Sequence, residues 1–170
     1  SGSGEFIFTS SDGTTSIPYE IETYSSSSGR FIGWVNVTTL SATANTDIYM
    51  YYGGAAAGVA TNQNKTGTWN TNYEGIWHLP NGTTLGALDS TGVNNGSISG
   101  ATTATGKMGG GGSFDGVNDS INAGTNDSLN ITGTSITVSA WVKTATVTGD
   151  HGIFERVNGA TSGYFYKQDN

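Results

Sequence analysis

The chain has no cysteine, two prolines, two histidines and few charged residues of either sign. A secreted animal domain of this size would often carry disulfide bonds, so their absence favours a prokaryotic surface protein. Lysine and glutamate are scarce, and few segments could offset the entropy lost on ordering as isolated helices. No apolar run has membrane-spanning length and no signal-peptide pattern is present.

The residues that are abundant predict an all-β protein. The 170 residues include 27 glycines, four tryptophans and eight tyrosines. Glycine supplies tight turns, whereas aromatic and β-branched residues favour strands and can form a core. The net charge of −7 disfavours nucleic acid and anionic membrane surfaces as partners. The length allows one or two small domains.

The first 54 residues predict four strands separated by turn signals. The turns are Ser11-Asp12-Gly13, residues 25–29 and the pair Gly53-Gly54. Period-two alternation in the third strand places Phe31 and Val35 on one face and Trp34 on the other. The expected strands cover residues 5–9, 17–24, 31–37 and 47–52.

Residues 55–72 lack periodicity and predict a linker, which Trp69 anchors on a neighbouring surface. The second module then begins at residue 73. Its most regular strand is the segment 135–144, in which Ile136, Val138 and Val142 share one face. The expected strands of this module cover residues 73–79, 97–99, 113–115, 120–122, 135–144, 152–156 and 163–167.

Two families resemble this chain. Ile17-Pro18-Tyr19-Glu20-Ile21-Glu22, Gly33-Trp34-Val35-Asn36-Val37 and Ile48-Tyr49-Met50-Tyr51-Tyr52-Gly53, after Asp12-Gly13-Thr14, resemble DUF2341, a prokaryotic surface domain of unknown function. A second set of motifs looks like the first half of a concanavalin A-like or laminin G-like jelly roll. That set comprises Gly75-Ile76-Trp77-His78-Leu79, Asp89-Ser90-Thr91-Gly92, Asn95-Gly96, Ser113-Phe114-Asp115-Gly116 with Asp119, and Ala140-Trp141-Val142.

The resemblance implies two small β-sandwich modules, at residues 1–54 and 73–170. It also implies strands before the first module and after Asn170, because both sandwiches are incomplete here. Unpaired sheet edges would result. Either the chain is a segment of a larger protein, or a neighbouring copy supplies the missing strands.

Glu20 and Glu22 are the closest approach to a catalytic carboxylate pair. Their spacing places both on one face of a strand, whereas glycosidases of the concanavalin superfamily use a Glu-x-Asp-x-x-Glu strand. We expect a solvated strand face and no enzyme. His78 and His151 are too few for a zinc site, and we expect His78 in a core or interface.

Two loops rich in oxygen ligands make Ca²⁺ the one candidate cofactor, because hard cations prefer carboxylate, amide and carbonyl oxygens. The alternative is that these side chains only form Asx-turns. The candidate metal ligands are Asp89, Asn94 and Asn95 in one loop and Asp115, Asn118 and Asp119 in the other.

Aromatic side chains and glycosylation sequons are the remaining candidates. Aromatic rings can stack on sugars beside polar groups, but Trp77 and Trp141 lie in regular strand patterns that favour sheet packing. Asn36 has a sequon within a strand and is the weakest glycosylation candidate. The loop sequons are at Asn64, Asn81, Asn95, Asn118, Asn126 and Asn130.

Together these features predict a non-catalytic extracellular surface module for adhesion or carbohydrate recognition. Its partners would be glycans or other copies of itself, without nucleic acid and without direct membrane insertion. The alternative is a structural subunit of a filament or surface layer, in which open sheet edges pair between copies.

Overall fold

The computed structural model describes residues 6–53, 63–80, 82–145, 151–158 and 162–168. Its regular elements are mostly antiparallel strands paired two by two, with one turn of α-helix and one of 3-10 helix. The predicted all-β fold is therefore confirmed. The chain forms two compact units, Ser1–Gly124 and Thr125–Asn170, which we describe separately.

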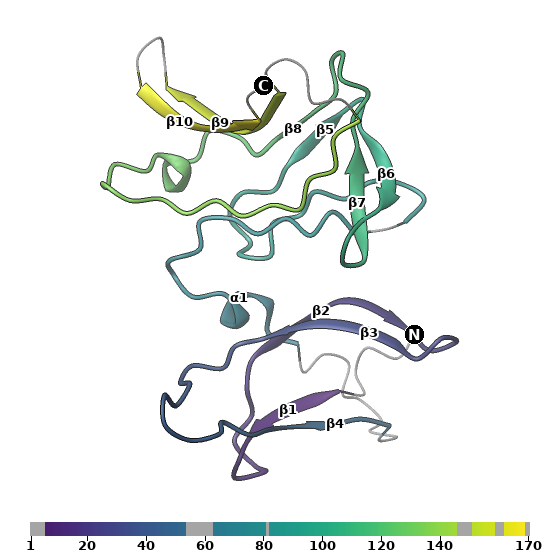
Figure 1. Ribbon diagram of the computed structural model, residues 1–170, viewed down its shortest axis with the longest axis vertical. Helices are drawn as coiled ribbons and strands as arrows, with labels where there is room; N and C mark the ends of the chain where they lie inside the picture. Colours follow the sequence, from purple (N-terminus) through teal and green to yellow (C-terminus); the bar gives the residue numbers. More distant parts are fainter. Residues whose placement is uncertain (1–5, 54–62, 81, 146–150, 159–161, 169–170) are drawn as a thin grey trace. The chain divides into compact units, whose positions relative to one another are not determined.

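The first unit begins with a small sandwich of two two-stranded sheets (Figure 1). One sheet pairs β1 (Ile7–Ser10) with β4 (Ile48–Tyr51), and the other pairs β2 (Tyr19–Ser25) with β3 (Arg30–Val35). All four strands occur where the sequence predicts them. The apolar core between the sheets is an aromatic cluster, to which Ile21, Tyr24, Phe31 and Val35 add partly buried side chains. Its buried members are Phe6, Phe8, Ile17 and Tyr19.

A bulge in β2 decides which side chains reach this core. The β2–β3 register shifts between Ile21 and Thr23, so Glu22 is the extra residue of the bulge. An extra residue reverses the alternation of side chains beyond it. Ile21 and Tyr24 can therefore both pack on the core, although strict alternation would place them on opposite faces.

The turn after β1 forms as predicted from Ser11-Asp12-Gly13. The Oδ1 atom of Asp12 accepts hydrogen bonds from the backbone N–H groups of Thr14 and Thr15, both at 2.8 Å. Gly13 has a φ of 72°, a left-handed conformation that glycine adopts without strain. Hydrogen bonds, chiefly from the Thr15 side chain, hold the pKa of Asp12 well below its usual range.

The rest of the first unit holds the short helix α1 (Lys65–Thr68) and a long, broken hairpin. The hairpin pairs β5 (Ser97–Ser99) with β8 (Ser120–Asn122), and β6 (Thr102–Thr105) with β7 (Gly110–Ser113). Strands β5 and β8 confirm the prediction. The predicted strand at 113–115 is wrong, since β7 lies earlier, over the glycine run. Bare backbone is needed there because a Cβ on Gly106 would lie 1.8 Å from the Gly110 carbonyl oxygen.

Two predicted strands are absent from the described structure. In segment 73–79 only Trp77 makes a bridge, to Asp89, and the positive φ of 50° at Leu79 ends the extended backbone. In segment 135–144 the residues join no ladder and many side chains are exposed, with Trp141 at 72%. Alternation specifies which side chains share a face, but a strand also needs a neighbouring strand to pair with.

The second unit consists of the 3-10 turn η2 (Asp127–Leu129) and one hairpin in its described part. Strand β9 (His151–Asn158) pairs antiparallel with β10 (Ser162–Gln168), and both strands lie where the sequence predicts strands. Among the described residues, none of the helices has the length and apolar character needed to cross a bilayer.

Candidate functional site

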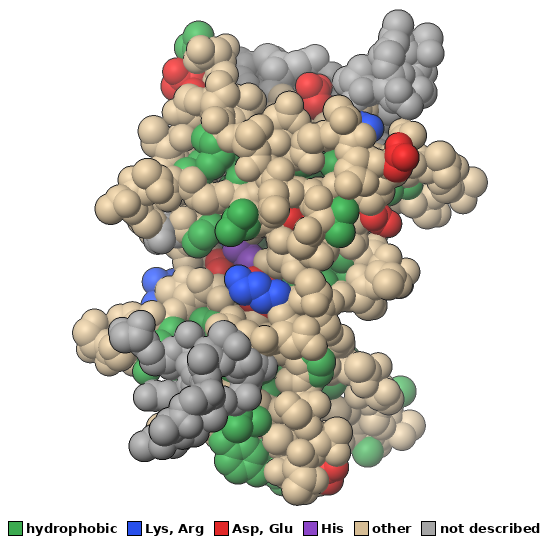
Figure 2. All heavy atoms as spheres, turned by 180° about the vertical axis from the view of Figure 1, so that it is seen from behind, with side chains coloured by type: hydrophobic (Ala, Val, Ile, Leu, Met, Phe, Trp, Pro, Cys, Tyr) green, Lys and Arg blue, Asp and Glu red, His purple; other side chains and the backbone are tan. Residues whose placement is uncertain are grey.

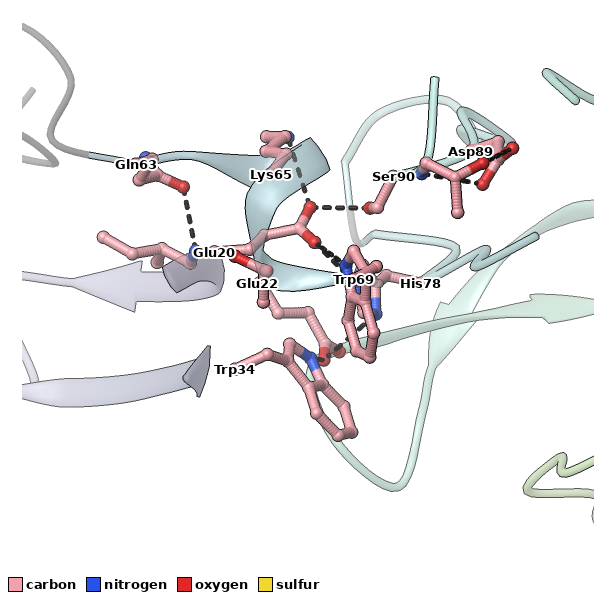
Figure 3. Close-up of polar contacts among 12 residues, drawn as sticks. Glu20, Glu22, Trp34, Gln63, Lys65, Trp69, His78, Asp89 and Ser90 are labelled. Carbon is pink, nitrogen blue, oxygen red and sulfur yellow. Dashed lines mark hydrogen bonds and ion pairs between the residues drawn. The ribbon is translucent and has the colours of Figure 1, made fainter. Parts of the chain in front are cut away.

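The polar face of β2 carries a buried pair of carboxylates. The residue Glu20 is 2% exposed, and the side chain of Glu22 is also buried. The expectation of a solvated strand face is therefore wrong. The sequence pattern placed both carboxylates on one strand face, but it could not show that α1, His78 and Ser90 cover them (Figure 3).

Both carboxylate oxygens of Glu20 are occupied by donors. Ser90 Oγ donates to Oε1 at 2.6 Å, and Lys65 Nζ lies 3.4 Å from the same atom. Trp69 Nε1 donates to Oε2 at 2.8 Å, and His78 Nε2 lies 3.2 Å from it. The four partners come from α1, the residue after it and two later loops, so Glu20 joins segments up to 70 residues apart.

Glu22 completes the cluster from the bulge position. Its Oε2 accepts a hydrogen bond from Trp34 Nε1 at 2.9 Å and lies 3.5 Å from His78 Nδ1. His78 therefore bridges the two carboxylates with its two ring nitrogens. Its ring stacks on Trp34 at a centroid distance of 5.6 Å and a 22° interplanar angle, and it also lies against Trp69. We name Glu20, Glu22, Trp34, Lys65, Trp69, His78 and Ser90 the Glu20 cluster.

The Glu20 cluster holds Glu20 ionised. Burial raises the pKa of this carboxyl, but hydrogen bonds from His78, Ser90 and Trp69 and the charge of His78 outweigh it and lower the pKa to about 2. Figure 2 shows one place on this face where acidic, basic and histidine side chains meet. A carboxylate with this pKa is an acceptor and a fixed negative charge, and it does not carry a proton at neutral pH.

Hydrogen bonds from the segment before Trp69 build one side of the cluster. Asn64 N donates to Tyr19 O at 3.0 Å, and Gln63 Oε1 accepts from Ile21 N at 2.8 Å, so this segment lies along β2. Asn64 caps α1, with its side chain accepting from Gly67 N. The described part of the predicted linker, residues 63–72, is thus packed on the sandwich, and Trp69 anchors it as predicted.

This arrangement favours a structural role over a catalytic one. A glycosidase needs a carboxylic acid of raised pKa and a second carboxylate, with the sugar between them. Here the pKa of Glu20 is lowered, and the His78 ring occupies the space between the two carboxylates. Glu20 is therefore ionised at neutral pH, with both oxygens accepting hydrogen bonds, which is not the state of the general acid of a glycosidase.

The first predicted metal loop is held by hydrogen bonds to its own backbone. Asp89 Oδ1 accepts from Ile76 N and Thr91 N, and Oδ2 accepts from the Thr91 hydroxyl and from Val93 N and Asn94 N. Burial raises the pKa of Asp89, and these hydrogen bonds lower it below the ordinary value. Five donors leave little room for a cation at this carboxylate, which supports the Asx-turn alternative.

The other predicted ligands have the following places. Asn95 Oδ1 accepts from Asp89 N at 2.9 Å, and Asn94 Nδ2 donates to Glu74 O at 2.6 Å. In the second loop, Asp119 Oδ2 accepts from Asp115 N, and Asp115 Oδ1 accepts from Val117 N and, at 3.5 Å, from Asn118 N. No group of three or more His, Cys, Asp or Glu side chains suited to a metal ion occurs among the described residues.

The loop sequons differ in how far their side chains are engaged. The side chains of Asn64 and Asn126 cap helical turns, and Asn95 Oδ1 accepts a hydrogen bond from Asp89 N. Asn118 and Asn130 are exposed to solvent. Asn81 lies outside the described residues. Glycosylation at these positions stays a prediction.

The partners of Glu20 could not be predicted from the sequence. Two glutamates two residues apart on a strand marked the polar face, and His78 was expected in a core or interface, which is where it lies. Lys65 and Ser90 carry no distinguishing pattern. A buried carboxylate requires donors, so the one available signal was the unusual Glu20-x-Glu22 pair next to the tryptophan-bearing strand β3.

Comparison with known families agrees with the first of the two resemblances. Residues 4–78 match the family described as Domain of unknown function (DUF2341). The matched segment extends beyond residue 54, where the sequence placed the end of the first module, and includes every member of the Glu20 cluster except Ser90. No curated protein and no solved structure matches the chain.

Proposed function

We propose that the chain is a non-catalytic extracellular surface module for adhesion or carbohydrate recognition. A DUF2341 domain would be followed by the first part of a laminin G-like jelly roll. The lowered pKa of Glu20 and the closed hydrogen bonding of its cluster support the non-catalytic part of this proposal. The scarcity of charge and the richness in Ser, Thr and Asn suit an exposed surface protein.

The observation that supports carbohydrate recognition is a pair of exposed tyrosines on β4. Tyr49 and Tyr51 are 47% and 49% exposed, and their spacing of two residues places them on one face of the strand. Tyr51 Oη donates to the Gly13 carbonyl at 3.3 Å, which fixes the ring beside the polar turn of Asp12. Aromatic faces flanked by polar groups bind the C–H faces and hydroxyls of sugars.

A glycan array followed by titration with any sugar that binds would test this proposal. We expect saturable binding that the free sugar competes away and that Tyr49→Ala and Tyr51→Ala each weaken at least tenfold. Val117→Ala is a matched control, because Val117 is an exposed side chain on another loop. Absence of saturable binding to any glycan, or equal binding by all three variants, would contradict the proposal.

A second candidate function is that of a structural subunit assembled by strand pairing between copies. It is favoured by the open edge of β4, which pairs only with β1 in the described structure. Electron micrographs of concentrated protein would distinguish the two functions. Regular polymers whose formation no sugar inhibits would favour the structural subunit.

A further inference from the structure

Among the described residues, β4 pairs with β1 alone, and its other edge presents backbone groups that join no ladder. Phe8 O accepts from Ile17 N, and Ser10 makes backbone bonds to Thr15 and Gly13. The peptide groups of Phe8 and Ser10 therefore face away from β4. Opposite residues in an antiparallel pair either exchange both bonds or neither. Met50, opposite Phe8, and Ile48, opposite Ser10, consequently point their own N–H and C=O groups away from β1.

This edge lacks the features that usually prevent an exposed strand from pairing with another chain. Ile48–Tyr51 contains no charge, proline or bulge, and its side chains are exposed on both faces. Hydrophobic side chains reach the surface at the end of the first unit that holds β1 and β4 (Figures 1 and 2). An uncharged strand with outward peptide groups is suited to receive another strand.

We propose that β4 pairs antiparallel with β4 of a second copy, about a two-fold axis that passes through Met50. This register gives the second candidate function a specific interface, on which it rests, and it does not depend on sugar binding. It places outward peptide groups opposite outward peptide groups, since Met50 faces Met50 of the partner copy and Ile48 faces Tyr52. An axis through Tyr49 or Tyr51 would do so too, but the axis through Met50 is the one that places Tyr49 opposite Tyr51.

The same register makes every side-chain pair compatible. Tyr49 lies opposite Tyr51 of the other copy, an aromatic pair of the kind that stabilises antiparallel strands. Asp47, the one charged residue next to the strand, lies opposite Gly53, so no like charges meet. Pairing would also join the tyrosine faces of the two copies into one group of four rings.

The size of the contact predicts a weak dimer. A stable interface buries about 800 Å² on each partner, and the paired segments, β4 with Tyr52 from each copy, provide only part of that. We therefore expect pairing that is seen at high protein concentration, on a surface where copies are crowded, or after covalent trapping.

Disulfide trapping tests the register directly, because the natural chain has no cysteine. Tyr49 and Tyr51 of opposite copies would form a non-hydrogen-bonded pair with Cα atoms about 4.5 Å apart, within the range that a disulfide bridges. We expect Tyr49→Cys/Tyr51→Cys to form covalent dimers under mild oxidation at least tenfold faster than Tyr49→Cys alone or Val117→Cys. Equal rates in all three would overturn the proposed register.

Two variants at the two-fold axis separate pairing from folding. Met50→Lys places two positive charges opposite each other, and Met50→Pro removes an N–H that the β1–β4 ladder does not use. Each, added to the double-cysteine variant, should abolish trapping while circular dichroism shows that the fold is retained. If either folded variant is trapped at an undiminished rate, the proposal is wrong.

These results also separate the interface from the structural-subunit function. Trapped dimers without polymers would support the β4–β4 pairing and contradict the structural-subunit function. Polymers that form without trapping between positions 49 and 51 would support the structural-subunit function and contradict the β4–β4 interface.

Discussion

Replacing Glu20 by glutamine tests whether the buried carboxylate holds the first unit together. Glutamine keeps the shape and one acceptor but removes the charge that faces His78, Trp69, Ser90 and Lys65. Removing one partner of a buried ion pair leaves the others without compensation and usually costs about 3–5 kcal/mol.

The lowered pKa of Glu20 gives a second, independent value for the free energy by which the charged carboxylate stabilises the fold. The difference between the ordinary value of 4.5 and about 2 corresponds, at about 1.4 kcal/mol per pKa unit, to roughly 3 kcal/mol. Because the folded pKa is the lower one, this stability is present above pH 4.5 and is lost as the pH falls toward 2. At pH 2.5 less than about 1 kcal/mol should remain.

The assay is urea unfolding of the wild type and Glu20→Gln at pH 7 and pH 2.5. We expect the variant to be less stable by roughly 3 kcal/mol at pH 7, with the difference shrinking by about 2–3 kcal/mol at pH 2.5. Glu74→Gln, at an exposed glutamate, is the control and should change little at either pH. A difference below about 0.5 kcal/mol at pH 7, or one that does not change with pH, would refute the reasoning.

Three further predictions concern single contacts. Trp69→Phe removes the indole donor to Glu20 and should lower the free energy of unfolding by about 2 kcal/mol at pH 7; an unchanged urea midpoint would contradict this. Gly100→Ala places a Cβ 1.8 Å from Asp119 Oδ1 at a φ of +75°, and should lower the melting temperature by several degrees; calorimetry showing no decrease would count against it. Calcium added to chelator-stripped protein should give neither saturable heat nor a thermal shift, since Asp89 already accepts five hydrogen bonds; either signal would restore the calcium hypothesis.

Local pattern was a reliable guide to two of the three hairpins, and it missed the β6–β7 hairpin, whose second strand runs over glycines. The β2–β3 and β9–β10 pairs are hairpins, in which turn residues and alternation act together. The sequence also placed Phe31 and Val35 on one face and Trp34 on the other, and the structure shows that Phe31 and Val35 pack on the core. It could not place the bulge at Glu22, because a bulge depends on the register of two strands.

Two other predictions failed because the sequence does not show which distant segments come together. Segment 135–144 alternates more strictly than any other, yet its residues join no ladder in the described structure. The carboxylates of β2 were taken as solvated because nothing near them in the sequence covers them. Their partners Lys65, His78 and Ser90 lie 45 to 70 residues away, a separation at which single-sequence patterns carry no pairing information.

The Glu20 carboxyl carbon provides the most direct test of the claim that this cluster is structural rather than catalytic. Its ¹³C chemical shift, followed by NMR between pH 7 and pH 1.5, reports the protonation of this one group. We predict a midpoint at about 2, because hydrogen bonds from His78, Ser90 and Trp69 stabilise the ionised form. A midpoint at 5 or above would contradict that claim and would make Glu20 a candidate catalytic acid.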